Sequence, residues 1–124
     1  MKTPKQFRGF WKIESMAQWD TDYIDLVVPG FFDFDDDLMG SFQFGTVVGW
    51  LDCRVRQVEA EETLEWSWEG HSDTDPGSGR GFARVEGGNL VGHVFIHQSD
   101  DSSFVAVRRT DQPAPRRKSR STGG

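Results

Sequence analysis

Tryptophan is the residue type in this chain that most suggests a binding site. The five indole rings belong to Trp11, Trp19, Trp50, Trp66 and Trp68. Rings of this kind line pockets for flat or apolar ligands, and they also fill the core of small domains, which is their commoner role. The ligand-binding hypothesis assigns six side chains to such a pocket: Trp19, Tyr23, Trp50, Trp66, Trp68 and His93.

Few residues of the chain could support thiol or metal chemistry. Cys53 is the single cysteine, and as a nucleophile it would need a base such as His93 or His97. A lone cysteine is more often a buried, inert thiol. The two histidines lie four positions apart on a predicted strand, which separates them by about 13 Å, too far to hold one ion. We therefore expect no catalytic residues, no metal and no cofactor, and an enzyme is the least supported class.

Acidic and glycine-rich segments offer weak alternatives. Residues 33–37 lack the glycine and final glutamate of an EF-hand loop, and residues 71–75 could bind Ca²⁺ only loosely. Solvated turns explain both. Residues 77–81 read Gly-Ser-Gly-Arg-Gly but open no helix, so we expect a flexible hairpin loop and no phosphate site.

The segment around Asp52 allows two strand registers. If Leu51 and Cys53 face the core, Asp52 and Arg54 face outward. In the inverted register Asp52 and Arg54 form a buried pair inside, which would be a site candidate. We favour the outward register slightly, although Trp50 shares that face.

Alternating apolar and polar residues predict strands along most of the chain. Residues 64–68 carry the clearest alternation, with Leu64, Trp66 and Trp68 on one face. Between the first two strands, Ser15 caps a predicted helix over 16–27, with Trp19 and Tyr23 on its apolar face. The expected strands span 7–14, 31–34, 40–48, 49–58, 63–70, 79–85, 90–97 and 102–109, with a loop at 71–78 and a tight Gly-Gly turn at 87–88.

These elements predict an all-β, mainly antiparallel fold. About eight strands with short connections favour an up-and-down barrel with one short helix between strands 1 and 2. We expect a flexible N-terminus at 1–6, the barrel domain at 7–110 and a disordered basic tail at 111–124, where no apolar residue is larger than Ala114.

Charge and composition limit the partners. The net charge is −6, and the tail holds four basic residues against one acidic residue, so the body is more acidic still. Such a body repels phosphates, and we expect no nucleic-acid binding by it. We find no signal peptide, no span of ~18 apolar residues and a single cysteine, which together predict a cytoplasmic protein with no membrane contact.

Two ends of the chain resemble a known family pattern. Gly9-Phe10-Trp11 and Arg108-Arg109 are similar to the calycin pattern of lipocalins and fatty-acid-binding proteins. The resemblance implies that the tryptophan packs across the barrel base against a late arginine. Residues 7–109 also resemble short bacterial proteins of uncharacterised function, through segments such as 66–70, and that likeness implies no activity.

The sequence thus predicts a non-catalytic β-barrel binding module, a monomer or small homo-oligomer. Its leading ligand is a small amphipathic or aromatic molecule inside the barrel. The alternative is a protein-interaction accessory module with a filled core and an acidic outer surface.

Overall fold

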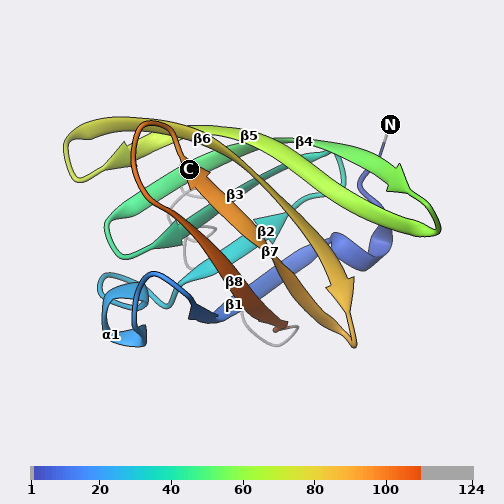
Figure 1. Ribbon diagram of the computed structural model, residues 1–124, viewed down its shortest axis with the longest axis horizontal. Coiled ribbons are helices and arrows are strands. Elements are labelled where there is room, and N and C mark those ends of the chain that lie inside the picture. The colour runs from blue at the N-terminus through green and yellow to red at the C-terminus, as the bar shows by residue number, and fades with distance from the viewer. Residues whose placement is uncertain (1, 110–124) are drawn as a thin grey trace, which may run out of the picture.

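The computed structural model describes residues 2–109, which form a closed barrel of eight antiparallel strands (Figure 1). Each strand pairs with its neighbours in sequence, and β8 pairs with β1 to close the barrel. The predicted up-and-down topology with a short helix between β1 and β2 is therefore confirmed, whereas the predicted tail at 111–124 lies outside the described residues. The elements are η1 (Lys5–Phe7), β1 (Gly9–Met16), α1 (Thr21–Ile24), β2 (Phe31–Phe34), β3 (Met39–Phe44), β4 (Val47–Val58), β5 (Glu61–Ser72), β6 (Asp75–Glu86), β7 (Asn89–Ile96) and β8 (Asp101–Arg108).

Aromatic rings fill the middle of the barrel. Phe32 on β2 lies at their centre, with its ring centroid 4.5 Å from that of Phe104 and 5.5 Å from those of Phe42 and Trp66. These four rings come from β2, β3, β5 and β8. Because β2, β5 and β8 are not adjacent strands, the Phe32 ring contacts those of Trp66 and Phe104 across the interior. Side chains therefore occupy this level of the barrel, as is usual for eight strands.

The β5–β6 hairpin is longer than the sequence predicted. Residues 71–78 were expected to form a loop, but β5 continues to Ser72 and β6 starts at Asp75, which leaves a two-residue turn. The glycines there serve packing. A Cβ atom on Gly81 would lie 2.5 Å from Nε1 of Trp66, and one on Gly79 would lie 2.6 Å from Nε1 of Trp68. The glycine-rich segment is therefore strand backbone beneath two indole rings.

The β3–β4 turn was also placed wrongly. The break expected at Gly49 occurs at 45–46, where Gly45 has a φ of +58°. A Cβ atom there would lie 2.2 Å from the ring of Tyr23, so the residue must be small as well as left-handed. Gly49 instead lies inside β4, paired with Phe42.

The predicted helix over 16–27 is reduced to one turn. Met16 belongs to β1, where it pairs with Phe104 of β8. The cap is not Ser15 but Asp20, whose carboxylate accepts a 3.0 Å hydrogen bond from the Tyr23 amide. Strand pairing extends β1 over residues with a helical pattern, because closure of the barrel needs β8 to be paired along its length.

The barrel end opposite α1 is closed by the N-terminal residues (Figure 1). Phe7 is fully buried, and its carbonyl accepts a 3.0 Å hydrogen bond from Nε1 of Trp11. Thr3 is buried too, and its hydroxyl accepts a bond from the Leu38 amide. The flexibility expected for residues 1–6 stays a prediction, although the Thr3 side chain is held by this hydrogen bond.

Candidate functional site

Trp66 and Trp68 lie inside the barrel, where the alternation of β5 predicted them to share a face. They are 4% and 2% exposed. Trp68 donates a 3.1 Å hydrogen bond from Nε1 to the carbonyl of Phe95, whereas Nε1 of Trp66 has no acceptor among the described residues. Both rings are core side chains, and only Trp66 retains an unused polar atom.

Trp19 and Tyr23 cover the barrel end beside α1. The Trp19 ring centroid lies 5.0 Å from that of Phe44 and 6.0 Å from that of Tyr23. The Tyr23 hydroxyl lies 3.3 Å from Oγ1 of Thr46 in the β3–β4 turn. This pair therefore connects the segment after β1 to the β3–β4 turn.

His93 faces outward on β7. Its Nε2 lies 2.5 Å from Oδ2 of Asp101 on β8, and its ring centroid is 4.6 Å from that of Phe95. The wall of the barrel separates it from Cys53, whose side chain faces inward and is 4% exposed. The structure therefore does not gather the six predicted ligand-binding residues into one pocket.

Cys53 is a core thiol. It lies opposite Trp66 in the β4–β5 pairing. Burial, with smaller contributions from the charges of Asp52 and Asp35, raises the pKa of the thiol from its ordinary 9.0 to about 12. The thiol is therefore protonated at neutral pH and is not an activated nucleophile.

The outer wall over β4, β5 and β6 carries the polar chemistry of the barrel. Leu51 and Cys53 face inward, so the outward register favoured for Asp52 and Arg54 is confirmed. Strand pairing sets the outward residues in three rows across β4, β5 and β6. The rows are Trp50–Glu69–Ser78, Asp52–Ser67–Arg80 and Arg54–Glu65–Phe82. We refer to this surface of nine residues as the outer trough.

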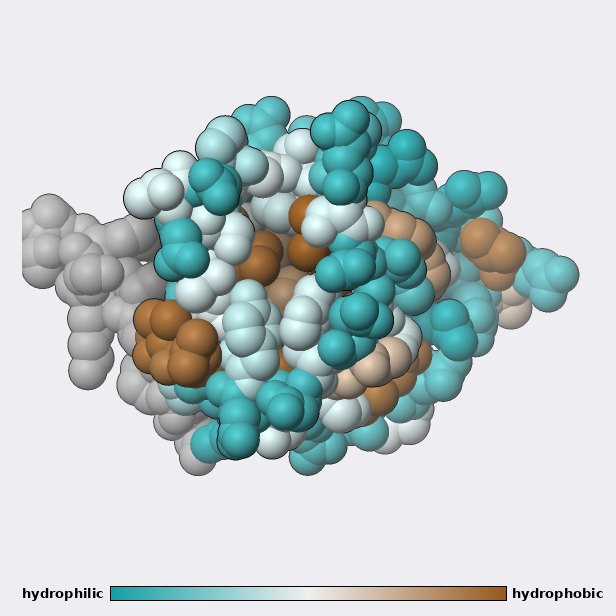
Figure 2. Space-filling model, turned by 60° about the vertical axis from the view of Figure 1, so that its left-hand side comes forward, coloured by the Kyte–Doolittle hydropathy of each residue, from teal (hydrophilic) through white to brown (hydrophobic). Residues whose placement is uncertain are grey.

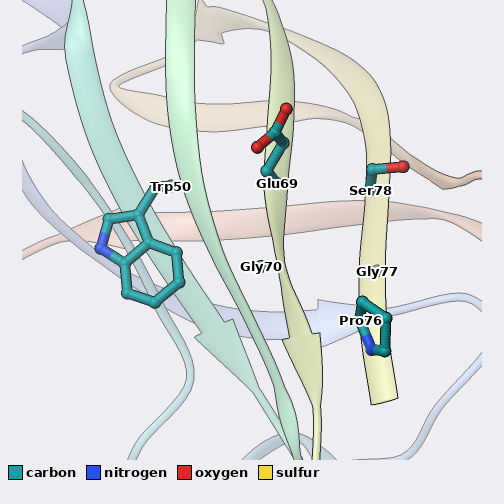
Figure 3. Close-up of a pocket in the computed structure, with 6 residues that line it drawn as sticks. All are labelled: Trp50, Glu69, Gly70, Pro76, Gly77 and Ser78. Carbon is teal, nitrogen blue, oxygen red and sulfur yellow. The ribbon is translucent and has the colours of Figure 1, made fainter.

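The first row borders a groove of about 620 Å³. Trp50 is 56% exposed, and its ring centroid lies 6.0 Å from that of His71 on β5. Figure 3 shows Trp50 on one side of Gly70 and the adjacent Pro76 and Gly77 on the other, and the two glycines carry no side chain into the space between. An exposed indole beside an open groove can receive an apolar side chain.

The other two rows border a second groove of about 400 Å³. Ser67 on β5 is a small side chain between Asp52 on β4 and Arg80 on β6. Phe82 on β6 and Phe95 on β7, the latter 41% exposed, add apolar surface. Charged and aromatic groups are therefore available together in one depression.

Most charges of the outer trough have no ion-pair partner within residues 2–109. Glu65 forms an ion pair with Arg56, at 3.2 Å, at the edge of the surface. Asp52, Arg54 and Arg80 make no ion pair within residues 2–109. Arg80 and Phe82 were not predicted as site residues. Both lie in the predicted strand 79–85, whose alternation places them on one face, but the sequence does not show that this face lies beside Ser67 and Glu65 of β5.

The rest of the described surface shows no comparable candidate site. The face in Figure 2 is mainly hydrophilic, and its hydrophobic side chains form separate small patches. Residues 2–109 contain no group of three or more His, Cys, Asp or Glu side chains placed to hold a metal ion. No helix in that range has the length and apolar content needed to cross a bilayer.

Comparison of the chain with protein-family models, with curated proteins and with solved structures found no match.

Proposed function

We propose that this protein is a non-catalytic binding module that binds another protein through the outer trough. The observation that supports this most is the exposure of Trp50, an indole that is 56% accessible beside an open groove. Tryptophan and arginine are among the residues most enriched where protein interfaces gain their binding energy. The trough presents Trp50 together with Arg54 and Arg80, whose guanidinium groups are unpaired in the described residues.

The filled interior favours an external ligand over an internal one. Phe32 contacts rings from three other strands across the barrel, which leaves that level to side chains. The protein therefore acts as the protein-interaction module that the sequence offered as an alternative, with its contact on a surface of mixed charge.

The barrel itself is proposed to be calycin-like. The Arg108 guanidinium carbon lies 4.1 Å from the centroid of the Trp11 ring, at the barrel end where the resemblance implied such a contact. The architecture supports a binding role in general and does not select the ligand.

Photo-crosslinking in cells tests the proposal. A photoreactive phenylalanine analogue replaces Trp50 in one variant and Glu14, an exposed residue of β1, in the control. We expect a discrete crosslinked protein species from position 50 and none from position 14. Equal crosslinking from both positions, or none from position 50, would count against the outer trough as a docking surface.

A small molecule inside the barrel is the second candidate. It is supported by Trp66, whose buried Nε1 has no acceptor among the described residues, since a buried donor left unpaired costs free energy. Native mass spectrometry of gently purified protein tests it. An added small mass that is lost on denaturation would support the internal ligand, and a bare chain would contradict it.

A further inference from the structure

We infer that the protein partner of the outer trough is a second copy of this chain, related by a two-fold axis parallel to β5. The inference rests on the proposed function and specifies its partner. A two-fold axis that lies in an interface makes the same surface serve both copies, so that surface must be complementary to itself. With the axis along β5, β4 of one copy lies over β6 of the other, and each row of the trough faces the same row reversed.

The middle row of the trough is complementary in charge to its own reversal. It reads Asp52–Ser67–Arg80 from β4 to β6. Reversed, it sets Asp52 of each copy against Arg80 of the other, twice in the dimer. Within one chain the two residues lie two strands apart and form no ion pair in the described residues. The small side chain of Ser67 lies on the axis, where it meets only itself.

The outer rows add apolar and cation–π contacts. In the first row, Trp50 faces Ser78 of the other copy, beside the open groove over Gly70 and Gly77. In the third row, Arg54 faces Phe82, a pairing of guanidinium with an aromatic ring. In each of the three rows, the residue on β4 thus faces a complementary residue on β6 of the other copy.

Two glutamates on the axis oppose the dimer. Glu65 meets its own copy, but Arg56 lies 3.2 Å from it and offsets its charge. Glu69 meets its own copy with no ion pair in the described residues. Because like charges across an interface are unfavourable, Glu69→Gln should tighten the dimer several-fold.

A charge-exchange experiment tests the inference. Sedimentation velocity is measured on the full chain and on Asp52→Arg and Arg80→Asp, with circular dichroism to confirm that each variant is folded. We expect the wild type to dimerise and each variant alone to weaken the dimer by about tenfold or more, because each places like charges face to face. An equimolar mixture of the two variants should regain the dimer, since both contacts then pair Arg with Asp.

Glu14→Lys, on the opposite wall, is the control for a general effect of charge and should leave the dimer unchanged. A wild type that stays monomeric at about 100 µM would overturn the inference. So would variants that dimerise as the wild type does, or a mixture that does not recover. A monomer that still crosslinks from position 50 to a different protein would overturn the second copy while leaving the proposed docking surface intact.

Discussion

The guanidinium group of Arg108 lies over the ring of Trp11, with its central carbon 4.1 Å from the ring centroid. The same group donates hydrogen bonds to the carbonyl oxygens of Arg8 and of Gln6, the latter at 2.7 Å. One side chain from β8 thus joins the first strand and the segment before it, at the end of the barrel where the sheet closes. A Cβ atom on Gly9 would lie 2.9 Å from this guanidinium group, so the glycine makes room for it.

Loss of this side chain should destabilise the fold. We expect Arg108→Ala to lower the free energy of unfolding by about 2–3 kcal/mol, because it removes a cation–π contact and two hydrogen bonds to carbonyl groups. Arg84→Ala, which removes an exposed ion pair with Glu86, should cost less than about 1 kcal/mol. Urea denaturation measures the free energy of unfolding of both variants. An equal decrease in the two would show that the Arg108 contacts stabilise the fold no more than an exposed ion pair does.

The glycines of β6 should differ sharply in their tolerance of alanine. Gly81→Ala places a methyl group 2.5 Å from Nε1 of the buried Trp66, and we expect it to cost about 1–3 kcal/mol through overpacking. Gly77→Ala is the matched control, since its Cβ atom would lie 3.5 Å from the nearest atom, the ring of Trp68. Thermal unfolding followed by tryptophan fluorescence separates the two. A Tm for Gly81→Ala that equals that of Gly77→Ala would refute the packing role of the glycine.

Cys53 should be unreactive in the folded protein. Its pKa of about 12 means that native protein at pH 8 reacts with a thiol reagent far more slowly than unfolded protein. Above pH 9 the unfolded thiol loses its proton while the folded one keeps it, so the thiol lowers the stability as the pH rises from 9 towards 12.

Cys53→Ala provides the comparison for that pH dependence. Other groups titrate in the same range and are unchanged by the substitution. The stability difference between wild type and variant should therefore shrink as the pH rises above 9. Rapid modification of native Cys53 at pH 8 would contradict the burial on which this prediction depends.

Asp25 should stabilise the connection into β2 in a pH-dependent way. Its Oδ1 accepts hydrogen bonds from the Gly30 amide at 2.8 Å and from Nζ of Lys12 at 2.9 Å. Burial raises the pKa of Asp25, but these two bonds outweigh it and hold the pKa below the ordinary 3.8. The carboxylate therefore contributes stability above pH 3.8, and this contribution is lost as the pH falls through the lower pKa of the folded state.

Asp25→Asn tests this directly. We expect a loss of about 1 kcal/mol at pH 7, modest because the ion pair is partly exposed. The loss should disappear in acid, where the wild-type carboxyl is also neutral. Asp22→Asn in α1, whose side chain is exposed and makes no hydrogen bond within residues 2–109, is the control. A deficit that persists unchanged at pH 2 would rule out the charge as its cause.

Much of the fold was predictable because the alternation of residues is local. The shared face of Leu64, Trp66 and Trp68 in β5 follows from period two alone, and the structure buries all three side chains. The Gly-Gly turn at 87–88 was also predictable, since both residues have positive φ, at 58° and 84°. The short turn at 73–74 was not, because glycines that serve packing beneath indole rings have the same composition as a flexible loop.

The candidate site was harder to predict for a different reason. Period two shows that Trp50 and Asp52 share a face, but it does not say whether that face is the core, because Leu51 and Cys53 on the other face are also apolar. Strand pairing decides which face is the core. Leu51 pairs with the buried Trp68 of β5, so Leu51 and Cys53 face inward and Trp50 faces outward.

By itself, the sequence determined the all-β class, the order of the strands and which residues share a face within a strand, since these depend on local periodicity and on short connections. Only the tertiary structure decided which tryptophans are enclosed and which is exposed. It also decided that Asp52, Ser67 and Arg80 lie in one row. That row joins three strands, and its register is fixed by hydrogen bonds between residues distant in sequence, which no local pattern records.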